Sequence, residues 1–457
     1  FQNMQKKCSI IIRTKNEERL IVSCLSVIFN QTYKNFEIII VDNESTDKTL
    51  EKIKKFPNIK YVGIQDYLPG CALNIGIRES SGEYIVCISG HCIPVDEFWL
   101  ENLVKRLESD ASFAGVYGRQ EPMSFSTPSD KRDLLLVFGL DEKIQSKDSF
   151  FHNANSIIHR KLWNKVPFDE EITNIEDRIW GQEMLNLGYK LAYEPSASVY
   201  HYHGIHQNGN QERVQNIVQI IQNMEDKLLI NNSLDAENLN IIVIIPIKGE
   251  DHLIGDKPQM SFTINSALES KYINDIFIDT SSKETAKLAK SLGANCPFLR
   301  SDNLIKPYIS LNSVIKDFVC KLEDSETYPD LLVILEETFP FRSQGLIDKM
   351  IERILETGLD TLIAAKPESG SLWQETEDQS IVRLDSGDTP RLYKEKTYLG
   401  LKGLCCITHP EFARNETLLG NKIGLYEVDS PLASFEVRTN SDRQIAAGLL
   451  NKWLPNH

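Results

Sequence analysis

Residues 9–17 read Ser-Ile-Ile-Ile-Arg-Thr-Lys-Asn-Glu, and residues 40–47 read Ile-Val-Asp-Asn-Glu-Ser-Thr-Asp. Each stretch begins with a short apolar, strand-like run and ends in a polar turn that leads into a helical pattern. Buried strands that are each followed by a helix are typical of a parallel sheet. In such sheets ligands bind beyond the carboxyl ends of the strands, so the two polar turns predict one binding cleft.

The same alternation continues through the first half of the chain. It predicts a mostly parallel sheet that is covered by helices on both faces. The predicted strands are 9–13, 36–41, 59–62 and 83–88, and the predicted helices are 17–29, 47–55, 71–79 and 96–108.

A second strand–helix pattern begins at Ile241, after a break. The sequence therefore predicts an α/β protein with two Rossmann-like domains joined by a helical linker, whose helix spans 212–230 and has one apolar face. That face packs either between the domains or against a second copy of the chain, which makes a homo-oligomer one candidate assembly. The predicted boundaries are 4–206, 207–239 and 240–457. The second domain has predicted strands at 241–245, 275–279, 331–335 and 361–365, and predicted helices at 261–269, 283–292 and 344–356.

Composition narrows the class of protein. The 457 residues are 41% hydrophobic and carry a formal net charge of −15, which predicts a globular chain that does not bind nucleic acid. The charge is −4 over residues 1–204 and −11 over the remainder. There is no run of about 18 apolar residues and no apolar leader, so no transmembrane segment is predicted. Nine cysteines without CxxC spacing predict reduced thiols and a cytoplasmic location.

Asp42 ends the second predicted strand, where its carboxylate can accept hydrogen bonds from a nucleobase edge or a sugar hydroxyl. The alternative is that this polar turn only caps the helix that follows, through Ser45, Thr46 and Asp47. We expect a ligand-binding role for Asp42 and a capping role for Asp47.

Seven short motifs follow one another in a fixed order. Together they resemble the inverting family 2 glycosyltransferases of the GT-A fold, above all a bacterial branch of rhamnosyl- and polysaccharide-type transferases, over residues 8–206. The resemblance implies transfer of a sugar from a nucleotide-sugar donor to a glycan or lipid-linked acceptor hydroxyl, with inversion, in bacterial surface glycan synthesis. The motifs are Arg-Thr-Lys-Asn-Glu (13–17), Val-Asp-Asn-x-Ser-Thr-Asp (41–47), Leu-Asn-x-Gly (73–76), Ser-x-His-x-x-Pro (89–94), Tyr-Gly-Arg-Gln-x-Pro (117–122), Asn-Ala-Asn-Ser (153–156) and Glu-Asp-x-x-Trp (176–180).

Such a transfer needs a base that removes the acceptor proton as the anomeric carbon is attacked. The resemblance makes Asp177 that base and places Glu176 and Trp180 on the acceptor side, and a paired carboxylate helps to keep a base poised. The alternative is a solvated, acidic helix start. The resemblance assigns donor binding to Arg13, Asn16, Glu17, Asp42, Asn43, Asn74, Ser89, His91 and Arg119.

The leaving phosphate also needs a positive partner. Most GT-A enzymes hold a divalent metal with Asp-x-Asp, whereas the matching place here reads Ser89-Gly90-His91. His91 can bind a metal together with His201 or His203, and imidazoles suit Mn or Zn better than Mg. The predicted cofactor is a divalent metal, Mn or Mg. The alternatives are structural histidines, and metal-independent transfer in which Arg119, Arg160 or Arg178 holds the phosphate.

The second half contains Ile-Ile-Val-Ile-Ile-Pro (241–246), Pro-Phe-Leu-Arg (297–300) and Pro-Phe-Arg (340–342). This order resembles the CMP-sugar synthetases over 240–452, and it implies a nucleotide-like pocket that includes Lys248, Arg300 and Arg342. The motifs depart from that family: acidic residues occupy the loop 247–252 that would cradle a triphosphate, and Arg438 stands where a metal-binding acid is expected.

Three functions follow from these observations. The first is a glycosyltransferase with an inactive cytidylyltransferase-like domain. The second is a bifunctional enzyme that makes a CMP-activated acid sugar and transfers it. The third is a non-catalytic protein that binds or assembles glycans or nucleotides.

Overall fold

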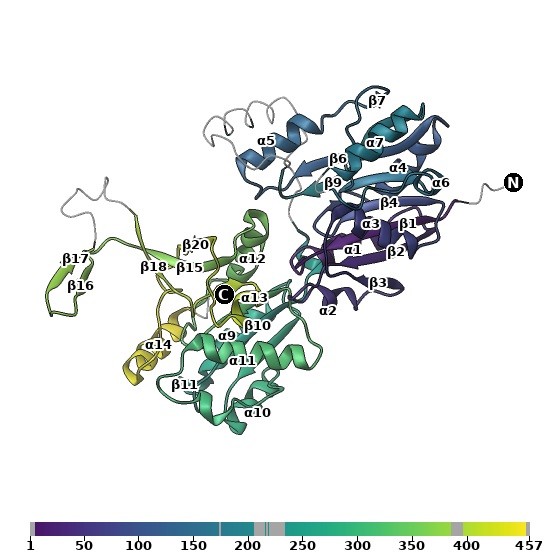
Figure 1. The fold of residues 1–457 in the computed structure, drawn as a ribbon. Coiled ribbons are helices and arrows are strands. Elements are labelled where there is room, and N and C mark those ends of the chain that lie inside the picture. Colours follow the sequence, from purple (N-terminus) through teal and green to yellow (C-terminus); the bar gives the residue numbers. More distant parts are fainter. Residues whose placement is uncertain are drawn as a thin grey trace. The chain divides into compact units, whose positions relative to one another are not determined.

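A computed structural model describes residues 5–172, 175–204, 234–384 and 396–453, together with Gln215 and Val218. The chain divides into two compact units, Phe1–Asn238 and Leu239–His457. Both are α/β, which confirms the predicted class of two Rossmann-like domains (Figure 1). Apart from the two single positions, the linker helix predicted over 212–230 lies outside the described residues.

A nine-stranded sheet forms the centre of the first unit, in the order β3-β2-β1-β4-β8-β6-β9-β5, with β7 beside β9. Its first four strands are parallel, as predicted. The others are mixed, because β8 runs antiparallel to both β4 and β6. The strands are β1 (Cys8–Thr14), β2 (Phe36–Asp42), β3 (Ile59–Gly63), β4 (Tyr84–Ser89), β5 (Ile93–Pro94), β6 (Phe113–Pro122), β7 (Lys143–Gln145), β8 (Asn155–His159) and β9 (Lys190–His201). The helices are α1 (Ile21–Phe29), α2 (Thr49–Ile53), α3 (Pro69–Arg78), α4 (Trp99–Glu108), α5 (Pro128–Val137), α6 (Arg160–Trp163), α7 (Glu176–Asn186) and the short 3-10 helix Ala236–Asn238.

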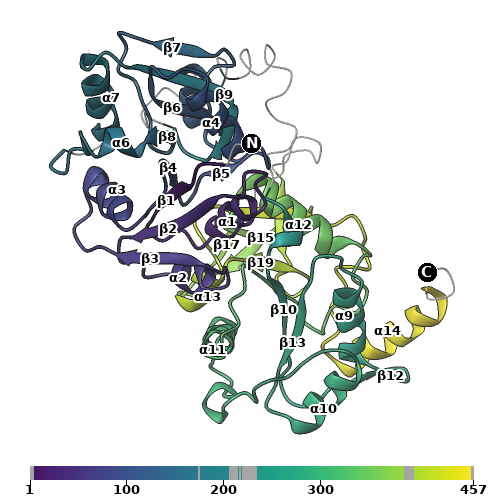
Figure 2. The same cartoon turned by 90° about the vertical axis from the view of Figure 1, so that its right-hand side faces the viewer.

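Strand β1 explains why both faces of this sheet are covered. Ile10, Ile11 and Ile12 are all fully buried, and successive side chains of a strand point to opposite faces. Ile10 and Ile12 pack in one core with residues of α1 and α4, whereas Ile11 packs in another with residues of α3 and α7. In Figure 2 these two helix pairs lie on opposite sides of the sheet. Each face of the sheet is thereby covered by its own hydrophobic core.

A two-residue strand brings two distant loops together in this unit. β5 follows the loop after β4 and pairs antiparallel with the end of β9, where Ile93 lies opposite Tyr200. The residues just before β5 therefore lie beside the last residues of β9.

Helix α1 begins at Ile21, whereas the sequence predicted a start at Glu17. Asn16 has a φ of 54°, and the carbonyl of Glu17 accepts hydrogen bonds from the N–H groups of Leu20 and Ile21. Residues 16–20 thus form a turn that keeps the Glu17 side chain at the edge of the sheet.

The second unit is built on a seven-stranded sheet in the order β13-β10-β14-β19-β15-β18, with β20 beside β15. β13, β10 and β14 are parallel. A separate hairpin, β16–β17, stands away from the rest of this unit (Figure 1). The strands are β10 (Ile241–Pro246), β11 (Leu253–Ile254), β12 (Lys257–Pro258), β13 (Asp275–Asp279), β14 (Leu331–Ile334), β15 (Thr361–Glu368), β16 (Trp373–Glu375), β17 (Ile381–Arg383), β18 (Thr397–Gly400), β19 (Cys406–Thr408) and β20 (Ile423–Glu427). The helices are α9 (Gln259–Leu268), α10 (Lys283–Ser291), α11 (Leu311–Asp324), α12 (Leu346–Thr357), α13 (Pro410–Arg414), α14 (Asn440–Trp453) and the 3-10 turn Asp302–Leu304.

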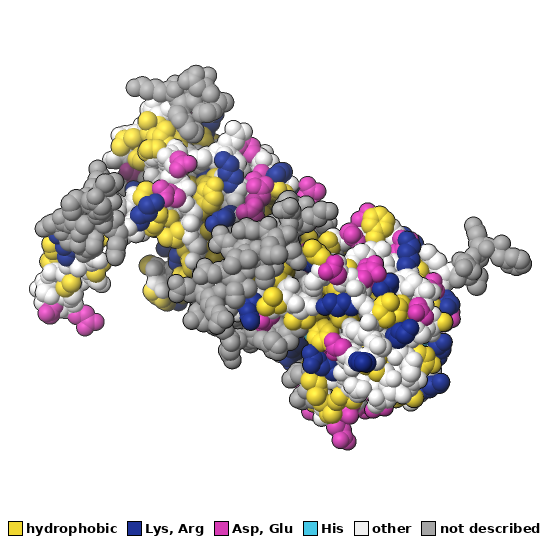
Figure 3. Space-filling view, turned by 90° about the horizontal axis from the view of Figure 1, so that it is seen from above, with side chains coloured by type: hydrophobic (Ala, Val, Ile, Leu, Met, Phe, Trp, Pro, Cys, Tyr) yellow, Lys and Arg dark blue, Asp and Glu magenta, His cyan; other side chains and the backbone are white. Residues whose placement is uncertain are grey.

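The described part of the chain has no helix that is long and apolar enough to cross a bilayer. All nine cysteines are free thiols. On the face drawn in Figure 3, the described Lys and Arg side chains are interspersed with Asp and Glu side chains.

Candidate functional site

The two polar turns at the carboxyl edge of the first sheet are bonded to each other. Asp42 is fully buried, and its carboxylate accepts hydrogen bonds from the Thr14 hydroxyl and the Ser45 N–H, each at 2.8 Å. Asn16 accepts from the N–H of Thr46, also at 2.8 Å. Asp42 and Asn16 therefore fix the shape of this edge, and donor contacts by them remain predictions.

The structure also places two neighbours of these residues. Asn43 donates its N–H to the carbonyl of Thr14, which continues the β1–β2 register past the strand ends. Asp47 accepts from the N–H and the hydroxyl of Thr49 at the start of α2, but the N-cap position itself is Lys48, so Asp47 supports the helix start from one residue before the cap. Donor binding by Asn43 stays a prediction.

Asn74 was predicted to bind the donor, and the structure corrects this. Its amide nitrogen donates to the carbonyl of Phe168 and to Glu170, and its amide oxygen accepts from Trp163 and from the N–H of Phe168. All four hydrogen-bonding positions of the amide are thus used within the protein. Asn74 anchors the segment around Phe168 to α3 and has no polar capacity left for a donor.

Glu176 and Asp177 begin α7 and are both buried, with 4% and 8% of their surface exposed. Asp177 accepts hydrogen bonds from the N–H groups of Asn153, at 3.1 Å, and Arg178, at 2.8 Å. The Arg13 guanidinium at the end of β1 lies 3.7 Å from Glu176 Oε1. The burial argues against a solvated, acidic helix start.

Burial is the main reason that the pKa of both carboxyls is raised. The charge of Asp177 raises the pKa of Glu176 further, and the nearby Arg13 opposes the rise in both. A buried carboxylate with a raised pKa is a stronger proton acceptor than a solvated one. The pair is therefore suited to general base chemistry.

Trp180 was predicted to lie on the acceptor side, and the structure places it in the core instead. Only 1% of its surface is exposed, and its indole N–H donates to the carbonyl of Val166 at 3.0 Å. Its ring packs against Phe151 and Phe168. The side chain anchors α7 to the core and is inaccessible to an acceptor.

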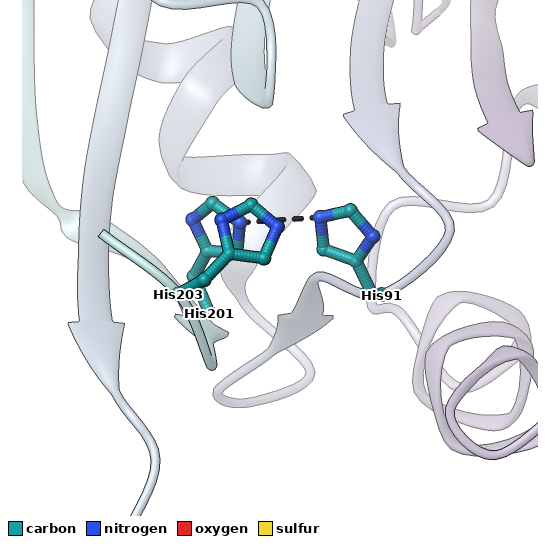
Figure 4. A group of neighbouring side chains, drawn as sticks. All are labelled: His91, His201 and His203. Atoms are coloured by element: carbon teal, nitrogen blue, oxygen red, sulfur yellow. Dashed lines mark hydrogen bonds between the residues drawn. The ribbon is translucent and has the colours of Figure 1, made fainter. Parts of the chain in front are cut away.

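His91, His201 and His203 form a cluster, and one nitrogen of each ring lies within 4.8 Å of the others. The β5–β9 pairing creates it, because His91 precedes β5 and His201 ends β9. Figure 4 shows the rings of His201 and His203 side by side, both facing His91. The Nε2 atoms of His91 and His201 are 3.1 Å apart.

The chemistry of this cluster fits a divalent metal. Glu17 Oε1 lies 2.6 Å from His91 Nδ1, and a carboxylate can only accept, so that nitrogen carries the proton. A neutral ring with its proton on Nδ1 directs the lone pair of Nε2 at His201. The separation of 3.1 Å is close to the roughly 3.0–3.4 Å between two nitrogens that are each about 2.1 Å from one ion. A carboxylate behind a metal-binding imidazole is also a common arrangement.

Burial keeps the other two rings in the form that binds metal. It lowers the pKa of His201 well below its ordinary value and also lowers the pKa of His203, and neighbouring histidines act in the same direction. A neutral imidazole has a free lone pair, and imidazole ligands suit Mn or Zn. Glu17, predicted to bind the donor, instead supports His91.

The arginines proposed for metal-independent transfer lie in different places. Arg160 donates to the carbonyl of Ile77 and to Ser80, at the opposite edge of the sheet from His91, so it cannot hold the same phosphate. Arg119 is buried at the end of β6, 3.5 Å from Glu121. Arg178 stacks on the ring of Phe150, 4.9 Å from its centroid. Donor binding by Arg119, and by the buried Ser89 at the end of β4, remains a prediction.

Sequence reasoning missed two residues of this site. Gln120 bridges His201 and His152, with distances of 2.7 and 2.9 Å. Gln120 could have been found from the sequence, because it lies in the motif Tyr-Gly-Arg-Gln-x-Pro. His152 could not, because it directly precedes the motif Asn-Ala-Asn-Ser and belongs to no motif itself.

In the second unit, two residues predicted for a nucleotide-like pocket are internal, which is a correction. Arg300 is buried against Asp279, with Nε 3.1 Å from Oδ2. Arg342 is buried and donates to the carbonyls of Leu404, Glu336 and Gly403. Both guanidiniums form hydrogen bonds to groups of the protein itself, which stabilises the fold. Lys248 is exposed after β10 and remains a candidate.

Acidic groups gather at the carboxyl edge of the second sheet. Asp251 follows β10, and Glu336 and Glu337 follow β14. Burial and the charges of Glu336 and Asp251 raise the pKa of Glu337 to about 7. Arg438 lies 2.6 Å from Glu436 and 3.3 Å from Glu336, so a guanidinium offsets part of the negative charge here.

Comparisons with known proteins agree with this division. Residues 9–166 match the family model "Glycosyl transferase family 2", and residues 252–397 match the model "Cytidylyltransferase". A Methanococcus voltae dolichyl N-acetyl-alpha-D-glucosaminyl phosphate 3-beta-D-2,3-diacetamido-2,3-dideoxy-beta-D-glucuronosyltransferase is 30% identical, over 41% of this chain and 64% of its own length. The O-antigen chain rhamnosyltransferase RfbN of Salmonella typhimurium is 27% identical, over 43% of this chain and 67% of its own length.

A third relative is named for the synthesis of a CMP-activated sugar. The CMP-N,N'-diacetyllegionaminic acid synthase of Legionella pneumophila is 28% identical, over 26% of this chain and 55% of its own length. The chain thus spans about two thirds or less of these three relatives. The N-terminal half of the chain resembles the family 2 glycosyltransferases, and the C-terminal half resembles the cytidylyltransferases.

Proposed function

We propose that the first unit transfers a sugar from a nucleotide-sugar donor to an acceptor hydroxyl during synthesis of a bacterial surface glycan, with inversion at the anomeric carbon. The observation that carries this proposal is the buried pair of Glu176 and Asp177 beside Arg13, at the carboxyl edge of the sheet. The match of residues 9–166 to family 2 glycosyltransferases supports it.

Asp177 acts as the base in this proposal. Two backbone N–H groups hold its carboxylate in place, and each oxygen still has a lone pair for the acceptor hydroxyl. Arg13 partly offsets the effect of burial on the pKa of Glu176, and a second carboxylate close by helps to keep a base poised. The acceptor oxygen then attacks the anomeric carbon, and the bond to the donor phosphate breaks on the opposite face.

The histidine cluster serves the leaving phosphate. His91, His201 and His203 would hold a divalent metal, which supplies positive charge to the nucleotide phosphates when bound. Glu17 orients His91 for this task. A donor contact by the Arg119 guanidinium would add a second positive group.

A thermal-shift screen tests the proposal. The melting temperature should rise with one of UDP, GDP, dTDP, CDP or CMP in the presence of Mn²⁺, because a ligand at 100 times its Kd stabilises the folded state by about 2.7 kcal/mol. Mg²⁺ and EDTA in place of Mn²⁺ serve as controls for the metal. The proposal fails if none of these nucleotides moves the transition under any metal condition.

We further propose that the second unit does not make a CMP-sugar. Arg300 and Arg342 are used internally, and Arg438 pairs with Glu336, one of the acidic groups beside the strand ends. Glu250 and Asp251, in the loop that would cradle a triphosphate, would repel CTP. The match to cytidylyltransferases and the relative that makes a CMP-activated sugar favour the bifunctional alternative, so a direct test is needed.

Incubation with CTP, Mg²⁺ and a panel of acid sugars separates these alternatives. We expect no release of pyrophosphate above the rate without enzyme, because the two arginines predicted for the pocket are bonded within the fold. An active CMP-sugar synthetase serves as the positive control for each sugar. Release with any sugar would establish the bifunctional enzyme instead.

A further inference from the structure

Gln120, in β6, connects the histidine cluster to the segment that holds the proposed base. Its side chain is 1% exposed and lies between two imidazoles. Its Oε1 is 2.7 Å from His201 Nδ1, and its Nε2 is 2.9 Å from His152 Nδ1. Every polar atom of this side chain therefore faces a histidine, in a place from which water is excluded.

The direction of each hydrogen bond in this chain is determined. The N–H of Ala154 points at His152 Nδ1 at 3.3 Å, and a backbone N–H can only donate, so this nitrogen is an acceptor. The amide nitrogen of Gln120 must then face His152, which turns the amide oxygen toward His201. That oxygen can only accept, so His201 carries its proton on Nδ1.

This tautomer leaves the Nε2 lone pair of His201 directed at His91, 3.1 Å away. On the other side, Glu17 fixes the proton of His91 on Nδ1 in the same way. Two independent partners thus turn both rings so that their Nε2 atoms point at one place, where a metal would replace the hydrogen bond between them. If Gln120 only filled the core, no particular tautomer of His201 would be required.

The same short segment also reaches the carboxylate pair. His152 accepts from Gln120, and the N–H of the next residue, Asn153, donates to Asp177 at 3.1 Å. The backbone of 152–154 therefore sets the position of the metal-facing ring and of the proposed base together.

We propose that Gln120 is a positioning residue that, held by His152, fixes the ring and tautomer of His201 so that its Nε2 binds a divalent metal together with His91. This inference rests on the metal site proposed above. It adds that the affinity for the metal depends on a glutamine that does not touch the metal.

Metal titration of the full chain without substrate tests this role. Gln120→Met should weaken binding of Mn²⁺ and Zn²⁺ by about 10–100-fold, the usual cost of losing a partner behind a metal ligand. Gln120→Glu keeps an acceptor for His201 and should stay closer to the parent. Gln145→Met is the matched control, because Gln145 is also buried in this unit but bonds Tyr117 and the carbonyls of Asp148 and Phe150.

Nitrogen NMR of labelled histidines gives a second readout that does not depend on the stability of a variant. Metal-free parent protein should show His201 with its proton on Nδ1. A proton on Nε2 of His201, or a Gln120→Met variant that binds metal as tightly as Gln145→Met, would overturn the role of Gln120. If His91→Ala leaves metal binding unchanged, the metal site itself is wrong, which separates the two failures.

Discussion

Replacing Asp177 with Asn is expected to lower kcat for sugar transfer by about 10²–10⁴-fold, the usual contribution of a general base. Asn keeps the size of the side chain and one acceptor for the N–H groups of Asn153 and Arg178. It cannot take the proton of the acceptor hydroxyl. The affinity for the nucleotide, measured by thermal shift, should therefore remain within a few-fold of the parent while steady-state transfer is lost.

The pH dependence gives a sharper form of this prediction. Burial raises the pKa of Asp177, so its carboxylate is protonated at a higher pH than an ordinary aspartate. The value of kcat/KM should therefore fall as the pH decreases through a value above about 3.9, the usual pKa of Asp, and the carboxylate pair should titrate as a unit. Asp141→Asn, at an exposed position of the same unit, should change neither rate nor profile. Full activity of Asp177→Asn would show that another group is the base.

Replacing His91 with Ala is expected to weaken the binding of Mn²⁺ by more than about 100-fold, because loss of a ligand costs more than loss of the partner behind it. It removes one of three imidazoles and leaves Glu17 without its partner. Calorimetric titration of the metal measures the effect directly. Where donor binding depends on Mn²⁺, the metal-dependent part of the nucleotide-induced rise in melting temperature should be lost as well.

His159→Ala is the matched control for this variant. His159 lies opposite Tyr84, at the other end of β4, and burial lowers its pKa to about 4. Its loss should change stability without changing the affinity for metal. Equal metal binding by the His91 and His159 variants would exclude the histidine cluster as the site.

The fold was largely predictable because it follows from local pattern. The runs of isoleucine in β1 and β10 have the length and composition of strands buried on both faces, and all six residues 10–12 and 241–243 are fully buried. Boundaries were less certain. The start of α1 moved from Glu17 to Ile21 because Asn16 has a left-handed conformation, which the sequence pattern alone does not reveal.

The site was predictable where chemistry depends on residue type and not where it depends on packing. His91 and Asp177 stand out as polar residues next to apolar runs, and the structure places His91 in a half-buried and Asp177 in a buried polar setting. Asn74, Trp180 and Arg342 carry equally suitable groups, but tertiary contacts use them within the protein. Gln120 went unnoticed because its partners are 32 and 81 residues away in the sequence.

The pairing of β5 with β9 also determines when the histidine cluster can exist during folding. His91 and His201 are 110 residues apart, so their nitrogens meet only after β9 has joined the sheet. Contacts of such long range form late, since the entropy of closing the intervening loop must be overcome first. An ion that binds the cluster therefore cannot help the early stages of folding. Once the sheet is complete, a bound ion stabilises it and lowers the population of every partly opened form in which β9 has left the sheet.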